Sequence, residues 1–485
     1  MTITARRIST SLMILALTAA PLAFAAAEST ATQFRGAPLA KELPGSEFGL
    51  AVSWVRDLGS GYSSVWIAED RAVTMFTAGD VDVVAAFDID SGNELWRYEL
   101  GEKYAGHDGS DDGPIGTPTV SDGVVYALGP HGAFVALGLD DGKERWRREL
   151  NEDNSTTPFY GYTTSPVVVD ELVILATGGE GHAVTAFDRA SGEPRWTSGD
   201  DAVSYQTPMV VELAGRVQLI TLTDQWLLGL DPETGEILWQ TRHTEGDQRD
   251  EAAHPTVIDD RRFLVKYARG AKLYEVTDDG LAEVWETRAF GNTFALPVLV
   301  GDHLYGFSGT ILTCVSVETG EIAWRSRELR SFGLTSIGGA LAILALDGDL
   351  VLVEPSPDGY RELTRTAALE NGNYAVPTYS DGTFMVRSLE QIAAVQIDRS
   401  LEPQVAEVDE SQRLLGEFGA WVASVEAMPA GERQSAVDRR FAEVESTPLV
   451  EADGTVHIVW RGEAEDVGVT GDVVEGGQEV GLYRV

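Results

Sequence analysis

Tyrosine side chains gather in short polar segments of this sequence, near residues 62–64, 160–163, 204–206 and 371–374. A tyrosine ring stacks on flat apolar surfaces, and its hydroxyl group makes hydrogen bonds, so convergent tyrosines can bind a sugar or a peptide. The alternative is that the rings only pack over one another. The candidate ligand-binding residues are Tyr62, Ser63, Tyr160, Tyr162, Tyr205 and Tyr374.

An acidic segment at residues 104–113 has the spacing that begins a calcium-binding loop. Asp108, Ser110 and Asp112 alternate, and Gly113 follows them. Alternate oxygen side chains can wrap a hard cation. The twelfth position of such a loop is Thr119 rather than glutamate. A calcium site and a solvated loop therefore both remain open.

Residue types that carry catalysis or hold cofactors are sparse. The single cysteine, Cys314, excludes an internal disulfide, a cysteine-based zinc site and a cysteine-ligated cluster. His131, His182 and His254 fall in different parts of the chain without the spacing of metal ligands, and no Gly-x-Ser-x-Gly motif occurs. The sequence predicts no catalytic residue and no cofactor.

Charge and hydropathy exclude two partner classes. The 485 residues carry a net charge of −41, which repels phosphate backbones and argues against nucleic-acid binding. Apart from one short N-terminal run, no stretch reaches the roughly 18 apolar residues that a membrane span needs. The composition is that of a globular protein, with 43% hydrophobic residues.

Residues 1–27 have the features of a secretory signal peptide. Arg6 and Arg7 precede an apolar run at 12–24, and small residues suited to cleavage occupy 23–27. The expected location is periplasmic or secreted. Because no cysteine follows the apolar run, we expect no lipid anchor at that position.

The elements that position the candidate residues form a repeat. A β-run, an acidic turn with glycine and then a tryptophan recur every 39 to 50 residues. A second phrase precedes each copy, usually with a proline before alternating apolar residues, as in Thr117-Pro118 and Thr207-Pro208. Each unit predicts four short strands, and such a period is typical of a β-propeller. The recurring tryptophans are Trp54, Trp96, Trp146, Trp196, Trp239, Trp285 and Trp324.

The number of blades follows from the two ends of the repeat. The last unit has three strands, at 374–380, 383–388 and 391–398, and lacks the tryptophan strand. Residues 51–56 are a tryptophan strand with nothing before it, so they are expected to complete the last blade and close the ring. The prediction is an all-β, eight-bladed propeller within residues 28–398, with seven blades as the alternative. The tryptophans are expected to fill the spaces between blades rather than to bind ligand.

These repeats resemble those of the pyrroloquinoline quinone (PQQ) enzyme repeat family, most strongly at residues 87–96, 187–196 and 230–239. That family includes quinone-dependent dehydrogenases and outer-membrane assembly scaffolds. The dehydrogenases imply PQQ, Ca²⁺, a catalytic aspartate and an adjacent cysteine pair, and this chain has Cys314 alone. The scaffold lipoproteins imply an anchoring cysteine, which this chain lacks as well.

After residue 398 the repeat stops. Residues 399–446 predict a linker and two short helices, and residues 447–485 predict strands. Residues 447–472 resemble the start of an immunoglobulin-like module that precedes esterase domains of the enterobactin-esterase type. We interpret 447–485 as a partial module, so that the chain ends in a small mixed helical and β appendage.

The function that these patterns favour is binding or scaffolding of a protein or glycan partner. A PQQ-dependent dehydrogenase is the enzyme alternative. A glycan- or ester-processing accessory protein is the second alternative, and it rests on the C-terminal resemblance.

Overall fold

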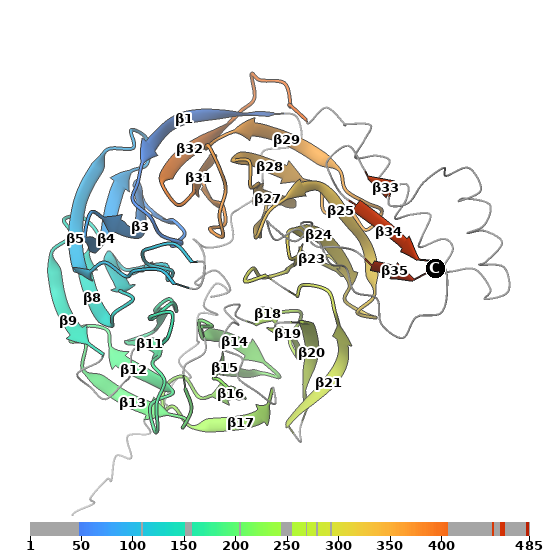
Figure 1. The fold of residues 1–485 in the computed structure, drawn as a ribbon. Coiled ribbons are helices and arrows are strands. Elements are labelled where there is room, and N and C mark those ends of the chain that lie inside the picture. Colours follow the sequence, from blue (N-terminus) through green and yellow to red (C-terminus); the bar gives the residue numbers. More distant parts are fainter. Residues whose placement is uncertain are drawn as a thin grey trace, which may run out of the picture.

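The computed structural model describes residues 48–107, 110–150, 158–202, 205–243, 255–267, 269–277, 280–291 and 293–405, together with three C-terminal strands. These residues form strands and turns, with no helix among them. Eight antiparallel four-stranded sheets stand around a common centre, and a separate three-stranded sheet follows. The eight-bladed propeller predicted from the repeat is therefore confirmed (Figure 1).

The first four blades each follow the chain from the innermost strand to the outermost strand. Blade 1 comprises β2 (Trp66–Ala68), β3 (Arg71–Ala78), β4 (Val81–Asp88) and β5 (Glu94–Glu102). Blade 2 comprises β6 (Thr119–Ser121), β7 (Val124–Leu128), β8 (Ala133–Gly138) and β9 (Glu144–Glu149). Blade 3 comprises β10 (Val167–Val169), β11 (Leu172–Ala176), β12 (Val184–Asp188) and β13 (Pro194–Ser198). Blade 4 comprises β14 (Met209–Leu213), β15 (Arg216–Leu222), β16 (Trp226–Leu230) and β17 (Ile237–Arg242).

The next three blades have the same order, and the eighth is completed from the other end of the chain. Blade 5 comprises β18 (Thr256–Val257), β19 (Arg262–Tyr267), β20 (Gly270–Thr277) and β21 (Gly280–Thr287). Blade 6 comprises β22 (Val298–Val300), β23 (His303–Ser308), β24 (Ile311–Ser316) and β25 (Ile322–Arg330). Blade 7 comprises β26 (Leu334–Ile337), β27 (Ala340–Leu344), β28 (Asp349–Val353) and β29 (Glu362–Ala367). Blade 8 contains β30 (Thr378–Ser380), β31 (Thr383–Arg387), β32 (Gln391–Asp398) and β1 (Gly49–Asp57).

The ring is closed by its first strand. Strand β1 pairs antiparallel with β32, with Gly49 opposite Asp398 and Asp57 opposite Gln391. Figure 1 shows this meeting of the blue and orange ends of the propeller. Closure covers a sheet edge of blade 8 that would otherwise present unpaired backbone groups.

Tryptophans on the outer strands join most blades to the next. Six of them donate their indole N–H to a backbone carbonyl oxygen in the following blade, and for Trp96 the acceptor is Leu139 at 2.7 Å. The other five donate over 2.8 to 3.2 Å, and these residues are Trp54, Trp146, Trp196, Trp285 and Trp324. Each tryptophan thus supplies both apolar area and a directional bond between blades.

Glycine is required where these rings lie on the neighbouring turn. Gly142 has φ of +63°, and an added Cβ would stand 2.7 Å from the Trp96 ring. The recurring glycine of the acidic turn therefore leaves space for the ring of the preceding blade. Trp239 is an exception, because its N–H bonds to Gln218 of its own blade at 2.6 Å. Its ring still stacks on Phe263 of blade 5, with centroids 6.1 Å apart.

Blade 7 has no tryptophan. The segment of chain that follows β32 contacts the outer strand of this blade at the tryptophan position. Thr364 faces Leu352 in the register in which Trp324 faces Cys314 one blade earlier, so Thr364 occupies the tryptophan position. After the chain leaves blade 8, it runs beside β29 of blade 7. The backbone N–H of Gln404 donates to Thr364 Oγ1 at 3.3 Å. The oxygen of Gln404 accepts from the backbone N–H of the next residue of β29, at 2.7 Å.

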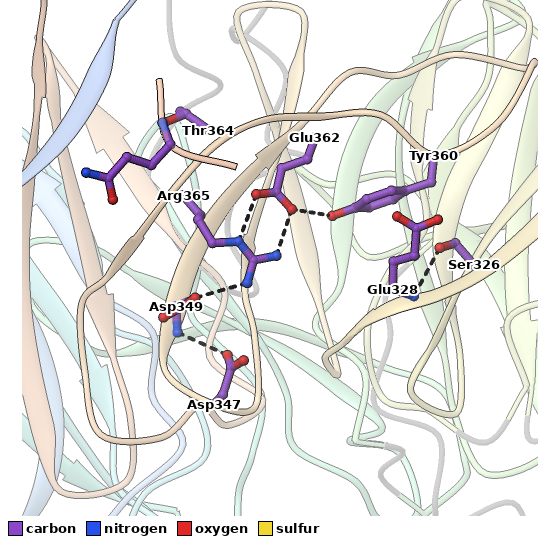
Figure 2. Close-up of polar contacts among 9 residues, drawn as sticks. Ser326, Glu328, Asp347, Asp349, Tyr360, Glu362, Thr364 and Arg365 are labelled. Carbon is purple, nitrogen blue, oxygen red and sulfur yellow. Dashed lines mark hydrogen bonds and ion pairs between the residues drawn. The ribbon is translucent and has the colours of Figure 1, made fainter. Parts of the chain in front are cut away.

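The outer strand of blade 7 also carries an ionic network (Figure 2). Arg365 donates two hydrogen bonds to Glu362, at 2.8 and 2.7 Å, and a third to Asp349 at 3.1 Å. The Tyr360 hydroxyl group donates to the same glutamate at 2.9 Å. Partial burial and then the charge of Glu362 raise the pKa of Glu328, which lies beside Tyr360 in Figure 2.

The C-terminal part is described as three strands only. Strand β33 (Leu449–Val450) pairs antiparallel with β34 (Val456–Trp460), which pairs in parallel with β35 (Leu482–Arg484). The helices expected within 399–446 lie outside the described residues. The partial immunoglobulin-like module therefore stays a prediction.

Candidate functional site

The connections between successive blades all lie on one face of the ring. Each blade is an antiparallel meander, so the loop from an outer strand to the next inner strand lies on the same face as the hairpin between the second and third strands. We call this the loop face. Four tyrosine-bearing segments singled out from the sequence belong to these inter-blade connections.

A first group of rings comes from three successive connections. This His107 cluster consists of Tyr104, His107, Phe159, Tyr160 and Tyr205. His107 stacks on Tyr160 with centroids 5.0 Å apart, and its Nε2 lies 2.8 Å from both the Tyr104 hydroxyl oxygen and the Phe159 carbonyl oxygen. The Tyr205 hydroxyl group accepts the backbone N–H of Tyr160 at 3.2 Å. Burial raises the pKa of Tyr104 to about 12, so its hydroxyl group stays protonated at neutral pH.

A second group of rings comes from the connections that lead into blades 1, 6, 7 and 8. This Tyr374 cluster consists of Tyr62, Phe294, Phe332 and Tyr374. Phe332 stacks on Tyr374 at 4.1 Å between centroids, and Phe294 meets the same ring edge-on at 5.6 Å. Tyr62 is 5.9 Å away from it. Tyr374 is thus the centre of four rings from four different connections.

A pair of hydrogen bonds joins the two clusters. The Tyr62 hydroxyl group donates to Asp111 Oδ2 at 3.1 Å and accepts the backbone N–H of Asp111 at 2.8 Å. Burial raises the pKa of Tyr62 to about 12, while the hydrogen bond from the Asp111 backbone lowers it and the Asp111 carboxylate raises it. Asp111 belongs to the same connection as His107. The rings therefore form one continuous arc that involves seven of the eight inter-blade connections.

Two rings of the arc reach well into solvent. Phe159 is 53% exposed and Phe294 is 38% exposed, although both are purely apolar. Ser63 and Tyr162 lie beneath the surface, with 0% and 1% exposure. Tyr162 packs in the core between blades 2 and 3. The structure thus brings Tyr62, Tyr160, Tyr205 and Tyr374 into the arc, and it places Ser63 and Tyr162 below it.

A chain of hydroxyl groups fixes the inner ends of these connections. Ser64 donates its backbone N–H to Thr117 Oγ1 at 3.0 Å, Thr117 to Ser165 Oγ at 3.0 Å, and Ser165 to Thr207 Oγ1 at 2.9 Å. The series of hydrogen bonds also reaches blade 8, because the backbone N–H of Val376 donates to Ser64 Oγ at 3.3 Å. Each bond crosses from one blade to the next, so five blades are tied together around the centre.

The acidic loop is folded by its own side chains. Ser110 Oγ donates to the carbonyl oxygen of His107 at 2.9 Å. Asp112 accepts the backbone N–H of Gly106 at 2.9 Å and pairs with Lys103 at 2.8 Å, and the Lys103 bond lowers the pKa of Asp112. Asp108 lies outside the described residues, so the calcium site stays a prediction. The described residues contain no group of three metal-binding side chains.

Sequence reasoning missed five members of the arc. Tyr104 and His107 lie in the acidic loop, Phe159 precedes a chosen tyrosine, and Phe294 and Phe332 stand alone in their connections. A signal was available for Phe294. It precedes Pro297 by three residues, as Tyr205 precedes Pro208 and Tyr374 precedes Pro377.

The residues present do not fit the quinone cofactor that the repeat resemblance implies. The adjacent cysteine pair is missing, because Cys314 is the only cysteine. Cys314 is fully buried in β24, where burial raises the pKa of its thiol to about 11. A buried, protonated thiol within a blade core cannot stand over a ligand at the loop face.

Comparisons with known proteins agree on the repeat. A family model described as outer membrane protein assembly factor BamB matches residues 80–326 and 223–401. The BamB of Burkholderia pseudomallei is 25% identical over 333 residues, which cover 65% of this chain and 79% of that protein. The BamB of Bordetella pertussis is 21% identical over 331 residues, covering 65% of this chain and 78% of that protein.

Solved structures show the same fold. The crystal structure of BamB from Moraxella catarrhalis matches with a TM-score of 0.53 and 20% identity, covering 72% of this chain and 97% of that one. The quinohemoprotein alcohol dehydrogenase from Comamonas testosteroni matches with a TM-score of 0.53 and 14% identity, covering 76% and 80%. An assembly factor and an enzyme thus share this architecture, so the fold alone does not decide the function. Within the described residues, no helix is long and apolar enough to cross a membrane.

Proposed function

This chain belongs to the family described as outer membrane protein assembly factor BamB, and from that premise we propose that it is a periplasmic scaffolding protein. Its partner would be a polypeptide in outer membrane assembly, bound at the loop face. The observation that supports the proposal is the arc of rings, with Phe159 and Phe294 exposed to solvent. Exposed aromatic side chains on a rigid frame are typical anchors of protein interfaces.

The shape of the arc favours a polypeptide over a compact ligand. The rings come from connections around much of the ring rather than from one pocket, so they suit an extended chain with several apolar side chains. Both clusters are pre-organised by stacking and hydrogen bonds, which lowers the entropy cost of binding. The dehydrogenase alternative lacks the cysteine pair, and we derive no step through a quinone.

The test uses an unfolded outer-membrane β-barrel polypeptide, fluorescently labelled and diluted from urea into the full chain. The variant combines Phe159→Ala with Phe294→Ala. Truncating an aromatic anchor costs more than about 1 kcal/mol, so the pair should weaken binding by about 30-fold. The control combines Leu95→Ala with Val284→Ala, which removes apolar side chains of similar exposure, 46% and 45%, from outer strands.

The control should bind within about twofold of the unmodified chain, and both variants should melt cooperatively. Equal binding by the two double variants would contradict the proposal. So would a preference of the unmodified chain for oligosaccharides over the polypeptide, because the second alternative predicts a glycan ligand.

A further inference from the structure

The most exposed ring of the arc, Phe159, stands at the tip of a tight turn. The backbone N–H of Gly161 donates to the Pro158 carbonyl oxygen at 2.9 Å, which closes a turn with Phe159 and Tyr160 at its central positions. Gly161 has φ of +70°. An added Cβ there would stand 2.9 Å from the Pro130 carbonyl oxygen, so the base of the turn lies against the hairpin of blade 2.

The peptide group between Phe159 and Tyr160 is bonded at both of its polar ends. Its carbonyl oxygen lies 2.8 Å from His107 Nε2, and its N–H donates to the Tyr205 hydroxyl oxygen at 3.2 Å. Because a carbonyl oxygen can only accept, Nε2 carries the hydrogen in this contact. His107 and Tyr205 belong to the connections that lead into blades 2 and 4, so this peptide group is held from two sides. We call these two bonds the peptide clamp.

The clamped peptide group is the one that turns over when a type I turn becomes a type II turn. A type II turn needs a positive φ at Tyr160, and φ is negative there. Turning the peptide group over would also break both bonds of the peptide clamp. The rotamers open to Phe159 depend on its backbone dihedral angles, so the peptide clamp limits the directions in which its ring points.

His107 also contacts the ring that the turn presents. It meets Phe159 edge-on with centroids 4.4 Å apart, while it stacks on Tyr160 at 5.0 Å. Phe159 in turn meets Tyr160 edge-on at 5.0 Å. With all these contacts made, Phe159 is still 53% exposed. A ring that is held and exposed loses less conformational entropy when it binds a partner.

The acidic loop holds His107 in its place. Ser110 Oγ accepts the backbone N–H of His107 at 3.1 Å and donates to the carbonyl oxygen of the same residue at 2.9 Å. The backbone N–H of the next residue, Asp111, donates to the Tyr62 hydroxyl oxygen at 2.8 Å. The loop at residues 104–113 therefore connects the peptide clamp to the Tyr374 cluster.

We propose that His107 and Tyr205 are positioning residues for polypeptide binding, because they fix the turn at 158–161 so that Phe159 meets the polypeptide in one orientation. The proposal rests on the proposed function and deepens it, since it names the groups that control affinity through Phe159. His107 acts through its Nε2–H group, and Tyr205 acts through its hydroxyl oxygen. Affinity at this end of the arc thus depends on hydrogen bonds as well as on apolar area.

The experiment uses the full chain and the same labelled outer-membrane β-barrel polypeptide. His107→Phe keeps a ring for stacking and removes the N–H donor, and Tyr205→Phe removes only the hydroxyl group. His107→Gln is the conservative variant, because its side-chain amide keeps an N–H donor. The control is Tyr98→Phe, which removes a hydroxyl group that donates to Glu144 at 2.6 Å between the outer strands of blades 1 and 2.

We expect His107→Phe and Tyr205→Phe each to weaken binding by about three- to tenfold, the range of one hydrogen bond. His107→Gln and Tyr98→Phe should bind within about twofold of the unmodified chain. When Phe159→Ala is already present, His107→Phe should have no further effect on affinity. An undiminished effect in that background would overturn the proposal, because His107 would then act by another route than Phe159.

Two further results separate the proposal from the proposed function. If binding depends on Phe159 and Phe294 but neither ring-preserving variant weakens it, the positioning role fails and the proposed function stands. If binding is indifferent to Phe159 and Phe294, the proposed function itself fails.

A measurement without ligand tests the peptide clamp directly. With 4-fluorophenylalanine at position 159, the fluorine resonance of the unmodified chain should differ from that of the urea-unfolded chain. In Tyr205→Phe the resonance should move toward the unfolded value, because the turn has lost one of its two ties. A resonance that does not move would overturn the proposal.

Discussion

The contact between Trp96 and Gly142 allows a quantitative test of how the blades are joined. Trp96 is 8% exposed and donates to the Leu139 carbonyl oxygen, so Trp96→Ala should lower the free energy of unfolding by about 3–5 kcal/mol. Gly142→Ala has two costs. An alanine at φ of +63° costs about 1–2 kcal/mol, and its Cβ would stand 2.7 Å from the ring. The Trp96 ring would have to move, which adds a packing cost of about 1–3 kcal/mol.

A matched glycine separates these two costs. Gly123 lies in the same blade with φ of +67°, and an added Cβ there meets nothing within 4 Å. Gly123→Ala should therefore show the backbone cost alone. Removing the ring should also relieve the clash, so Trp96→Ala with Gly142→Ala should be about 1–3 kcal/mol more stable than the sum of the single effects.

The assay is denaturant unfolding followed by far-ultraviolet circular dichroism, for the unmodified chain, the three single variants and the double variant. Two results would refute the reasoning. One is a Gly142→Ala cost no larger than that of Gly123→Ala. The other is strict additivity in the double variant, because the ring and the turn would then stabilise the protein independently.

Three further predictions concern the hydroxyl chain at the centre, the buried arginine of blade 8 and the pH dependence of stability. Thr117→Val keeps the side-chain shape but leaves the buried Ser64 N–H without its acceptor, which should cost about 1–3 kcal/mol in denaturant unfolding, whereas Thr117→Ser should cost much less. Arg387 of blade 8 is buried and donates to the carbonyl oxygens of Met75 and Gly61. Arg387→Met leaves these buried oxygens without donors, so the melting temperature should fall by several degrees; an unchanged value would show that these bonds do not stabilise the closed ring. The pKa of Glu328 is raised in the folded state, so its charge weakens folding above that pKa; Glu328→Gln should be stabilising at pH 7, and the gain should vanish as the pH falls below about 4.5. A gain that persists at pH 3 would show that charge is not the cause.

The propeller could be predicted because the residues that make its stabilising contacts recur in most of the sequence repeats. A tryptophan on the outer strand and a glycine in the acidic turn recur at a fixed phase, and the structure shows that the two meet across the blade boundary. The position of Trp54, one repeat length before Trp96, also indicated that the first strand closes the ring. The contact that replaces the tryptophan in blade 7 could not be predicted in the same way. Thr364 lacks any tryptophan signal, and its partner Gln404 lies 40 residues away in a segment without periodicity.

The loop face was predictable only where aromatic residues coincide with polar neighbours. Tyr62, Tyr160, Tyr205 and Tyr374 drew attention because they lie among serines, asparagines and glycines. His107 did not, because its partner Tyr160 lies in another connection, and stacking between connections leaves no trace in either one. Burial is equally hidden, since Tyr162 belongs to the same short segment as Tyr160 and faces the core.

The two kinds of aromatic residue therefore have separable effects. The tryptophans act at the outer strands, where six of the seven indole hydrogen bonds join two blades, and the hydroxyl chain acts at the centre from Ser64 to Thr207. Outside the inner ends that carry this hydroxyl chain, the connections on the loop face contribute less to holding the blades together. They can carry exposed rings such as Phe159. A change at a tryptophan should thus be measured as stability, and a change at the arc as affinity.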